Sequence, residues 1–205
     1  MIKNIVFDNG GVIVKYSAES YLDVFKFDKK KQRELDTLFV SDEWVKFAKG
    51  EITSEQFKQF ALNTFPNYSD DVIKILDVDN LKIMIPVYAK TLEFIYDLKK
   101  KGYKIYLLSD INEDTITYLK STILNFEELF DGLVYSCRVG MVKKDGKVFD
   151  YLLNTFNLRP NETLFLDDSL TNLARASEKN IVTYRFLDPD IDIDKIKSEH
   201  LNFMS

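Results

Sequence analysis

The chain has 205 residues, of which 45% are hydrophobic and 30% charged, so it can build one sizeable core with an insertion. Its net charge of -5, with both signs mixed along the chain, argues against a surface dedicated to nucleic acid or anionic membranes. The single cysteine, Cys137, excludes an internal disulfide, no apolar run reaches membrane-spanning length, and from the first residues we expect no secretion leader. We therefore expect a cytoplasmic protein, a monomer or weak homodimer, without nucleic-acid or membrane partners.

The stretch from Lys3 to Val12 predicts a buried strand that ends at a candidate ligand site. Residues 5–7 are β-branched or aromatic, and Asp8 and a pair of glycines follow them shortly afterwards. In open α/β sheets ligands bind at the carboxyl ends of strands, and glycine lets the backbone approach a bound group. Taken alone, the segment fits equally well a strand followed by a turn.

Residues 15–84 have aromatic and aliphatic side chains at helical spacing, which predicts a helical insert. Three predicted helices are marked by Ala18, Tyr21, Leu22 and Phe25 on one face, by Trp44, Phe47 and Ala48 ahead of a stop at Gly50, and by the capping-box spacing Thr53-Ser54-Glu55-Gln56. Ser69 is predicted as a further N-cap. We interpret the aromatic stripe of these helices as their own core rather than as a cofactor site.

From residue 85 helices and strands alternate, which predicts an α/β fold with a parallel sheet and helices on both of its faces. The predicted helices span 87–101, 114–124 and 148–156, with another ending near 179, and the predicted strands span 104–108, 133–135, 163–166 and 181–184. The acidic tail, 188–205, is predicted to be weakly helical and to serve only in packing.

Polar residues end three of the predicted strands, namely Asp8, Ser109 and the pair Asp167-Asp168. Parallel strands point their carboxyl ends the same way, so these groups should converge at one edge of the sheet. Acidic strand ends repel each other unless a cation lies between them, and a hard divalent ion such as Mg²⁺ suits carboxylate ligands. Lys143, in a later loop, supplies the positive charge that a phosphate group would also need.

Four motifs resemble, in order, those of the haloacid dehalogenase-like hydrolase superfamily: Phe7-Asp8-Asn9-Gly10-Gly11-Val12-Ile13, Leu107-Leu108-Ser109, Gly140-Met-Val-Lys143-Lys-Asp and Leu166-Asp167-Asp168-Ser169-Leu-Thr-Asn172. They cover nearly the whole chain, and four such motifs in register are specific although each alone is weak. The first motif is similar to the branch that contains α-glucose-1-phosphate phosphatase and the N-terminal phosphatase domain of epoxide hydrolase. The resemblance implies a Rossmann-like core at 1–14 and 85–205, with a small helical-bundle cap inserted at 15–84.

The resemblance implies a Mg²⁺-dependent phosphatase that hydrolyses a small phosphorylated metabolite, with sugar phosphates favoured. Asp8 would be the nucleophile and form an aspartyl-phosphate, while Ser109 and Lys143 would stabilise the reacting phosphoryl group. The implied phosphate-binding residues are Asn9, Gly10, Gly11, Ser109, Asp110 and Lys143.

The implied Mg²⁺ ligands are Asp8, the carbonyl of Gly10 and the acidic pair. Within that pair, Asp168 is the better candidate for direct contact, and Asp167 would bind the ion directly or support the residues that do. Asn172 would orient Lys143 or the metal ligands. Without the resemblance, plainer interpretations apply: Ser109 caps a helix, Asn172 lies on the surface and Lys143 is a solvated charge in a loop. For Lys143 taken alone, this plainer interpretation would be preferred.

Three positions depart from the family pattern. Gly10 replaces a second aspartate that usually acts as general acid and base, a loss that typically costs on the order of 10²- to 10⁴-fold in rate. Lys144 replaces a usual proline, so we expect Lys143 on a more mobile loop, where Lys144 could substitute for it. Asp110 replaces a frequent asparagine and should weaken dianion binding unless a cation offsets it.

Other functions stay open at this point. A catalytically impaired module that binds a phosphorylated ligand would explain Gly10, Asp110 and Lys144 as marks of decay. A 2-haloacid dehalogenase also lacks the second aspartate, but it needs no metal and leaves the acidic pair unexplained, while a phosphoryl-transferring mutase would need the missing acid and base. Candidates for the specificity-setting residues are Trp44, Lys46 and the Gly50-Glu51 turn.

Overall fold

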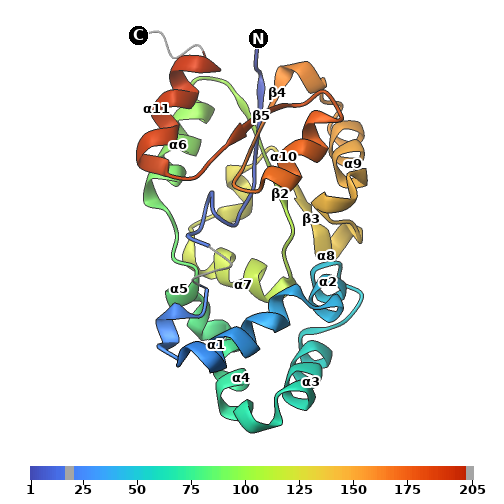
Figure 1. The fold of residues 1–205 in the computed structure, drawn as a ribbon. Helices are drawn as coiled ribbons and strands as arrows, with labels where there is room; N and C mark the ends of the chain where they lie inside the picture. The colour runs from blue at the N-terminus through green and yellow to red at the C-terminus, as the bar shows by residue number, and fades with distance from the viewer. Residues whose placement is uncertain (17–20, 202–205) are drawn as a thin grey trace.

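The centre of the computed structural model, which describes residues 1–16 and 21–201, is a parallel sheet (Figure 1). Its strands are β1 (Asn4–Phe7), β2 (Lys104–Ser109), β3 (Gly132–Tyr135), β4 (Thr163–Asp167) and β5 (Val182–Arg185). They lie in the order β3-β2-β1-β4-β5, and each neighbouring pair is parallel. Because β1 is central, its carboxyl end lies between those of β2 and β4, where this class of sheet binds ligands.

Alternate side chains of β1 enter two separate hydrophobic clusters, one on each face of the sheet. Ile5 and Phe7 belong to the larger cluster, and Val6 belongs to the other. Helices α6 (Ala89–Lys100), α7 (Glu113–Thr122) and α11 (Pro189–Glu199) contribute to the larger cluster, and α9 (Lys147–Thr155) and α10 (Leu170–Ser177) to the other. The predicted α/β fold with helices on both faces is therefore confirmed.

The insert between β1 and β2 is helical and lies beyond the carboxyl ends of the strands (Figure 1). It contains α1 (Lys29–Asp36), α2 (Asp42–Ala48), α3 (Ser54–Thr64), α4 (Ser69–Ile75) and α5 (Leu81–Met84). Buried side chains of the insert, among them Phe57 and Val72, continue the larger cluster of the sheet. One core thus joins the insert to the face of the sheet that α6 and α7 cover.

Short elements connect these helices and strands. The four-residue helix α8 (Ser136–Val139) follows β3 directly. Turns of 3₁₀ helix occupy Asp23–Phe25, Thr37–Val40, Pro66–Tyr68, Val78–Asn80, Phe126–Leu129, Lys143–Asp145 and Pro160–Glu162. Among the described residues, no helix combines the length and the apolar character needed to cross a membrane.

The helix predicted from the face shared by Tyr21, Leu22 and Phe25 is wrong, because only the 3₁₀ turn Asp23–Phe25 forms there. Lys26 ends that turn with a left-handed backbone, at φ 53°. Ala18, the fourth residue of that predicted face, lies outside the described residues.

The two predicted helix starts in the insert had different outcomes. The capping box is confirmed, since Thr53 accepts a hydrogen bond from the backbone N–H of Gln56 and the Gln56 side chain accepts one from that of Thr53. Ser69 does not act as an N-cap, because the turn Pro66–Tyr68 leads straight into α4 and Ser69 is already helical. Its hydroxyl instead donates to the Pro66 carbonyl at 2.7 Å.

Candidate active site

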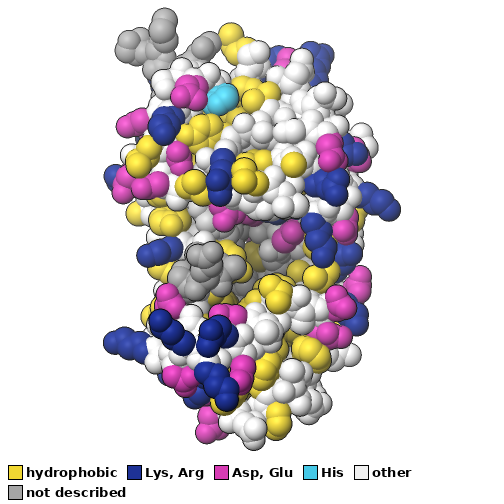
Figure 2. All heavy atoms as spheres, viewed as in Figure 1, with side chains coloured by type: hydrophobic (Ala, Val, Ile, Leu, Met, Phe, Trp, Pro, Cys, Tyr) yellow, Lys and Arg dark blue, Asp and Glu magenta, His cyan; other side chains and the backbone are white. Residues whose placement is uncertain are grey.

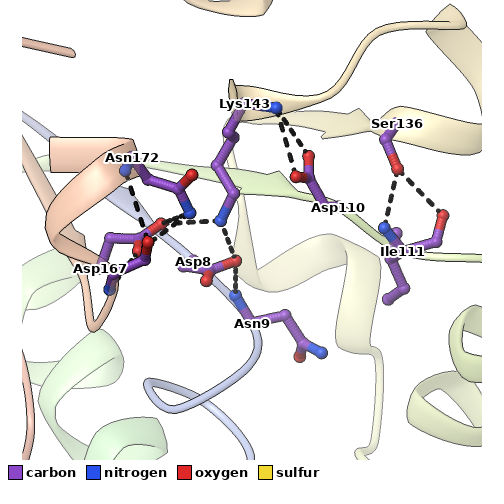
Figure 3. Close-up of polar contacts among 9 residues, drawn as sticks. Asp8, Asn9, Asp110, Ile111, Ser136, Lys143, Asp167 and Asn172 are labelled. Atoms are coloured by element: carbon purple, nitrogen blue, oxygen red, sulfur yellow. Dashed lines mark hydrogen bonds and ion pairs between the residues drawn. The ribbon is translucent and has the colours of Figure 1, made fainter. Parts of the chain in front are cut away.

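Asp8 lies just past the carboxyl end of β1 and is 6% exposed. Its Oδ1 accepts a hydrogen bond from the backbone N–H of Asn9 at 2.6 Å and pairs with Lys143 Nζ at 2.7 Å (Figure 3). Burial raises the pKa of Asp8 well above its ordinary value, and the charge of Lys143 opposes that rise. Since both contacts use Oδ1, the other carboxylate oxygen has no protein donor among the described residues.

Lys143 begins the 3₁₀ turn Lys143–Asp145, and only 2% of it is exposed. Its Nζ lies 2.7 Å from Asp8 Oδ1 and 2.7 Å from Asp167 Oδ2, and its backbone N–H donates to the Asp110 carboxylate at 3.0 Å. Burial by itself would lower the pKa of Lys143, but these carboxylates raise it above the ordinary lysine value, so the ammonium stays charged.

The plainer expectations about this loop are therefore corrected. Lys143 is a buried cation between carboxylates rather than a solvated loop charge, and Asp110 holds its backbone in place although the usual proline is missing. Lys144 points to solvent, and its carbonyl accepts a hydrogen bond from Arg175 Nε at 3.2 Å, so it does not substitute for Lys143.

Asp167, the last residue of β4, is fully buried and its carboxylate is saturated by protein donors. Oδ1 accepts from the backbone N–H of Ser169 at 2.8 Å, and Oδ2 accepts from Lys143 at 2.7 Å. Asn172 Nδ2 lies 3.2 Å from Oδ1 and 3.1 Å from Oδ2 (Figure 3). Asn172 therefore orients Asp167 and is not the plain surface residue considered above.

Asp168 differs from its neighbour because its carboxylate receives no hydrogen bond or ion pair from another residue of the described chain. Burial, followed by the charge of Asp167, raises the pKa of Asp168. Carboxylate oxygens of Asp8, Asp167 and Asp168 lie within 4.8 Å of one another. A hard divalent cation fits this donor set, since it would neutralise the one carboxylate that the protein leaves unpaired.

Gly11 makes room for this arrangement. Its φ is +73°, and a Cβ there would lie 2.7 Å from Asp168 Cγ, so a larger residue would displace the carboxylate. The preference for glycine at this turn is thus both conformational and steric.

A cavity of about 310 Å³ opens in front of these residues, and Figure 2 shows the surface hollowed between the sheet half and the helical half. The predicted residues that line it are Asp8, Asn9, Gly10, Asp110, Lys143, Asp168 and Asn172. Gly11 and Asp167 lie behind this lining. Ser109 ends β2 beside Tyr135, is 1% exposed and does not line the cavity, so its contact with a phosphoryl oxygen stays a prediction.

Several cavity residues were not predicted from the sequence. Tyr16 and Tyr21 line the cavity although aromatic residues of this region were assigned to the core of the insert. The Tyr16 ring lies 3.4 Å from where a Cβ of Gly10 would be, next to the space of the missing aspartate. Asn112, the N-cap of α7, also lines the cavity, and its position ahead of two acidic residues was the available signal.

Of the insert residues proposed to set specificity, some line the cavity and others do not. Trp44 of α2 lines the cavity. Lys46 is not among the lining residues and pairs with Glu43 at 3.2 Å. Gly50 is exposed and contacts the backbone at Cys137, since a Cβ there would lie 2.1 Å from the Cys137 carbonyl oxygen, and neither Gly50 nor Glu51 lines the cavity.

Comparisons with known proteins agree with this geometry. A family model described as haloacid dehalogenase-like hydrolase matches residues 2–177. D-ribitol-5-phosphate phosphatase of Bacteroides thetaiotaomicron is 26% identical over 197 residues, which are 90% of this chain and 92% of that protein. The magnesium complex of a HAD family enzyme from Bacteroides thetaiotaomicron gives a TM-score of 0.71 at 25% identity and covers 90% of this chain and 92% of that one.

A further relative is much longer than this chain. Bifunctional epoxide hydrolase 2 of Mus musculus is 35% identical over 89 residues, which are 42% of this chain and 16% of that protein. The matched segment thus spans about a sixth of the relative's length.

Proposed function

The chain belongs to the haloacid dehalogenase-like hydrolases, and from this premise we propose that it is a Mg²⁺-dependent phosphatase of small phosphorylated metabolites, with sugar phosphates favoured. The observation that carries the proposal is the meeting of three groups at one cavity. Asp8 has one free carboxylate oxygen, Lys143 is a buried cation, and Asp168 is a carboxylate without a protein partner. The activity named for the Bacteroides relative supports phosphate as the group transferred.

In this proposal residues 1–14 and 85–205 form the catalytic core, and residues 15–84 form the cap over it. Helices α1 to α5 lie beyond the carboxyl ends of the strands (Figure 1), and Trp44 and Ala48 of α2 reach the cavity wall. A cap in this place excludes water from the reacting groups.

Asp8 acts as the nucleophile through the carboxylate oxygen that Lys143 leaves free. Its attack forms a bond to phosphorus as the bond from phosphorus to the leaving-group oxygen breaks, which gives an aspartyl-phosphate. Water then attacks phosphorus, releases inorganic phosphate and regenerates the carboxylate. Because Gly10 has no side chain to act as an acid, the leaving oxygen takes its proton from water.

The phosphoryl group is held, in the same proposal, by Lys143, Ser109 and the backbone of the segment from Asn9 to Gly11, with Asp110 fixing the backbone of Lys143. The charge of Lys143 also opposes the rise that burial causes in the pKa of Asp8.

Asp8, the carbonyl of Gly10 and Asp168 would hold the metal ion, and carboxylate oxygens of Asp8 and Asp168 already lie within 4.8 Å of each other. Asp167 supports the site through Lys143 and Asn172, which already occupy both of its oxygens. Mg²⁺ bound there supplies the positive charge that lets a carboxylate approach an anionic phosphoryl group.

The unpaired carboxylate of Asp168 also favours phosphate chemistry over the 2-haloacid dehalogenase alternative, which has no use for a cation site. The three departures from the family pattern leave the Asp8 and Lys143 pair intact, which favours an active enzyme over an impaired binding module.

The test is hydrolysis of p-nitrophenyl phosphate and acetyl phosphate, with and without Mg²⁺, by the wild type and by Asp8→Asn. We expect Mg²⁺-dependent turnover that falls by more than about 10³-fold in Asp8→Asn, as for loss of a covalent nucleophile. Asp70→Asn, an exposed position on α4, is the matched control and should keep wild-type rates. Turnover that survives in Asp8→Asn would remove the proposed nucleophile.

A further inference from the structure

Part of the cavity wall is aromatic. Tyr16, Tyr21 and Trp44 all line it, and we call these three residues the aromatic wall. The Tyr16 and Tyr21 rings meet edge to face at 5.5 Å, and Tyr21 and Trp44 are each packed edge to face on Phe39, at 4.7 and 5.1 Å. Trp44 also contacts Phe57 of the insert core at 5.4 Å. The wall is thus held in place by the core of the insert before any ligand binds.

The cavity has very little positive charge to offer a ligand. Lys143 is the one lysine or arginine among the described lining residues, and it is already engaged by Asp8 and Asp167. Residues 17–20 and 202–205, which lie outside the description, contain neither lysine nor arginine. A second anionic group on a substrate would therefore face aromatic rings or the carboxylates of Asp110 and Asp168, and both environments disfavour it.

One uncharged polar group of the lining lacks a partner. Asn9 is 5% exposed, and its Oδ1 has no hydrogen-bond partner. The side-chain oxygen of Asn112, in contrast, already accepts from the N–H and the hydroxyl of Thr115, at 2.9 and 3.0 Å. A turn of the Asn9 side chain toward the cavity would let a substrate hydroxyl satisfy this buried acceptor.

We propose that the aromatic wall and Asn9 form the subsite for the leaving group and select phosphomonoesters whose leaving group is uncharged. An apolar C–H face of the leaving group lies on Tyr16, Tyr21 and Trp44, and a hydroxyl group reaches the Asn9 amide. Substrates with a second phosphate or a carboxylate are rejected. This inference rests on the proposed function and narrows its substrate class.

Trp44 provides a direct readout because it is the one tryptophan of the chain. Its fluorescence can be titrated in Asp8→Asn with matched ligand pairs that differ by one charged group: glycerol 3-phosphate against 3-phosphoglycerate, and glucose 1-phosphate against glucose 1,6-bisphosphate. We expect glycerol 3-phosphate and glucose 1-phosphate, whose leaving groups are uncharged, to perturb the emission and to bind at least about 10-fold more tightly than their partners. The reason is that juxtaposed like charges are strongly disfavoured. Equal affinities within both pairs would overturn the inference.

Added charge tests the same subsite in the active enzyme. Thr115→Lys places a cation in the lining and should shift the ratio of kcat/KM values toward the member of each pair that carries a second anionic group. Tyr151→Lys, on the exposed face of α9, should leave this ratio unchanged. An unchanged ratio in Thr115→Lys would contradict the subsite. Hydrolysis of acetyl phosphate by Tyr151→Lys should match that by the wild type.

The two proposals can fail separately. If acetyl phosphate is hydrolysed but the two ligands of each pair bind equally well, the proposed subsite is overturned and the proposed phosphatase activity is retained. If no phosphate ester or acyl phosphate is hydrolysed, the proposed phosphatase activity is overturned. The Trp44 titration then still tests the subsite, through the ratio of the dissociation constants of the two ligands in each pair.

Discussion

At the residue scale, Lys143 determines the charge state of the whole site. Its ammonium lies between Asp8 and Asp167, and its backbone N–H is held by Asp110, so one residue joins the ends of three strands. Buried carboxylates in such proximity would otherwise take up protons. The contacts of Lys143 therefore oppose the effect of burial on Asp8 and also stabilise the fold.

Lys143→Met removes the charge while keeping much of the side-chain volume. We expect kcat to fall on the order of 10²- to 10³-fold, as for loss of one electrostatic stabiliser of the transition state. The free energy of unfolding should fall by about 3 kcal/mol or more, because the carboxylates of Asp8 and Asp167 stay buried without an opposite charge. Urea unfolding and acetyl phosphate kinetics measure the two effects. Lys144→Met, one residue further along and exposed, should match the wild type, and equal losses in both variants would refute the distinction.

At the element scale, Ser136 joins the insert to the core. Its hydroxyl donates to the carbonyl of Ala48 at the end of α2 at 2.6 Å and accepts the N–H of Ile111, which follows β2, at 2.8 Å. Gly50 packs against the Cys137 carbonyl beside it, and Lys49 pairs with Asp145 at 3.1 Å. These contacts hold α2, and with it Trp44, over the cavity.

Ser136→Ala removes both hydrogen bonds and should lower the free energy of unfolding by about 1–3 kcal/mol, since the buried partners are left unmet. Because the joint positions α2, we also expect faster amide hydrogen exchange in residues 42–50 and a raised KM with a smaller change in kcat. Ser198→Ala on α11 is the control, and a Ser136→Ala variant with unchanged exchange over α2 would show that the joint is not needed.

A second joint at this scale ties α11 to β5 and is sensitive to pH. The Asp192 carboxylate accepts the backbone N–H groups of Leu187 and Asp188 at 2.7 and 2.8 Å and the hydroxyl of Tyr184 at 2.9 Å. Burial alone would raise the pKa of Asp192, but these donors hold it below its ordinary value of 3.8.

A lowered carboxyl pKa contributes stability that is complete above the ordinary value and is lost as pH falls through the folded-state pKa. Asp192→Asn should therefore cost about 1–3 kcal/mol at about pH 6, and its difference from the wild type should shrink below about pH 4. Urea unfolding at a series of pH values measures this. A difference that stays constant down to about pH 3 would contradict the assignment.

At the scale of the whole molecule, the site lies where the sheet and the insert meet. The larger hydrophobic cluster continues from one sheet face into the insert, so the two parts share a core while the polar residues face the cavity between them. A ligand that neutralises Asp168 should therefore stabilise the molecule as a whole.

Mg²⁺ should raise the midpoint of thermal unfolding at constant ionic strength, by the equivalent of about 2.7 kcal/mol at 100 times its dissociation constant. Asp168→Asn should lose this response, and without metal it should be at least as stable as the wild type, because a partly buried unpaired charge is gone. Asp70→Asn should keep the response. A wild type indifferent to millimolar Mg²⁺, or an Asp168→Asn variant that still responds, would count against the metal site.

Local and periodic information was enough to predict the sheet, the order of its helices and strands, and the strand-end residues Asp8 and Asp168. Such features depend on neighbours in the chain: runs of β-branched residues form strands, and parallel strands end on one edge. The irregular start of the insert was mispredicted, because short 3₁₀ turns satisfy the same apolar spacing as a helix.

The sequence by itself therefore determined the fold class, the edge of the sheet where the site lies and the acidic groups gathered there. Only the tertiary structure decided that Lys143 is buried between Asp8 and Asp167, that Asp167 is saturated while Asp168 is not, and that Tyr16, Tyr21 and Trp44 face the cavity. The physical reason is that burial, charge pairing and the partner of each polar atom depend on contacts between segments that can be more than a hundred residues apart in the sequence. A local sequence pattern does not indicate which of these segments come into contact.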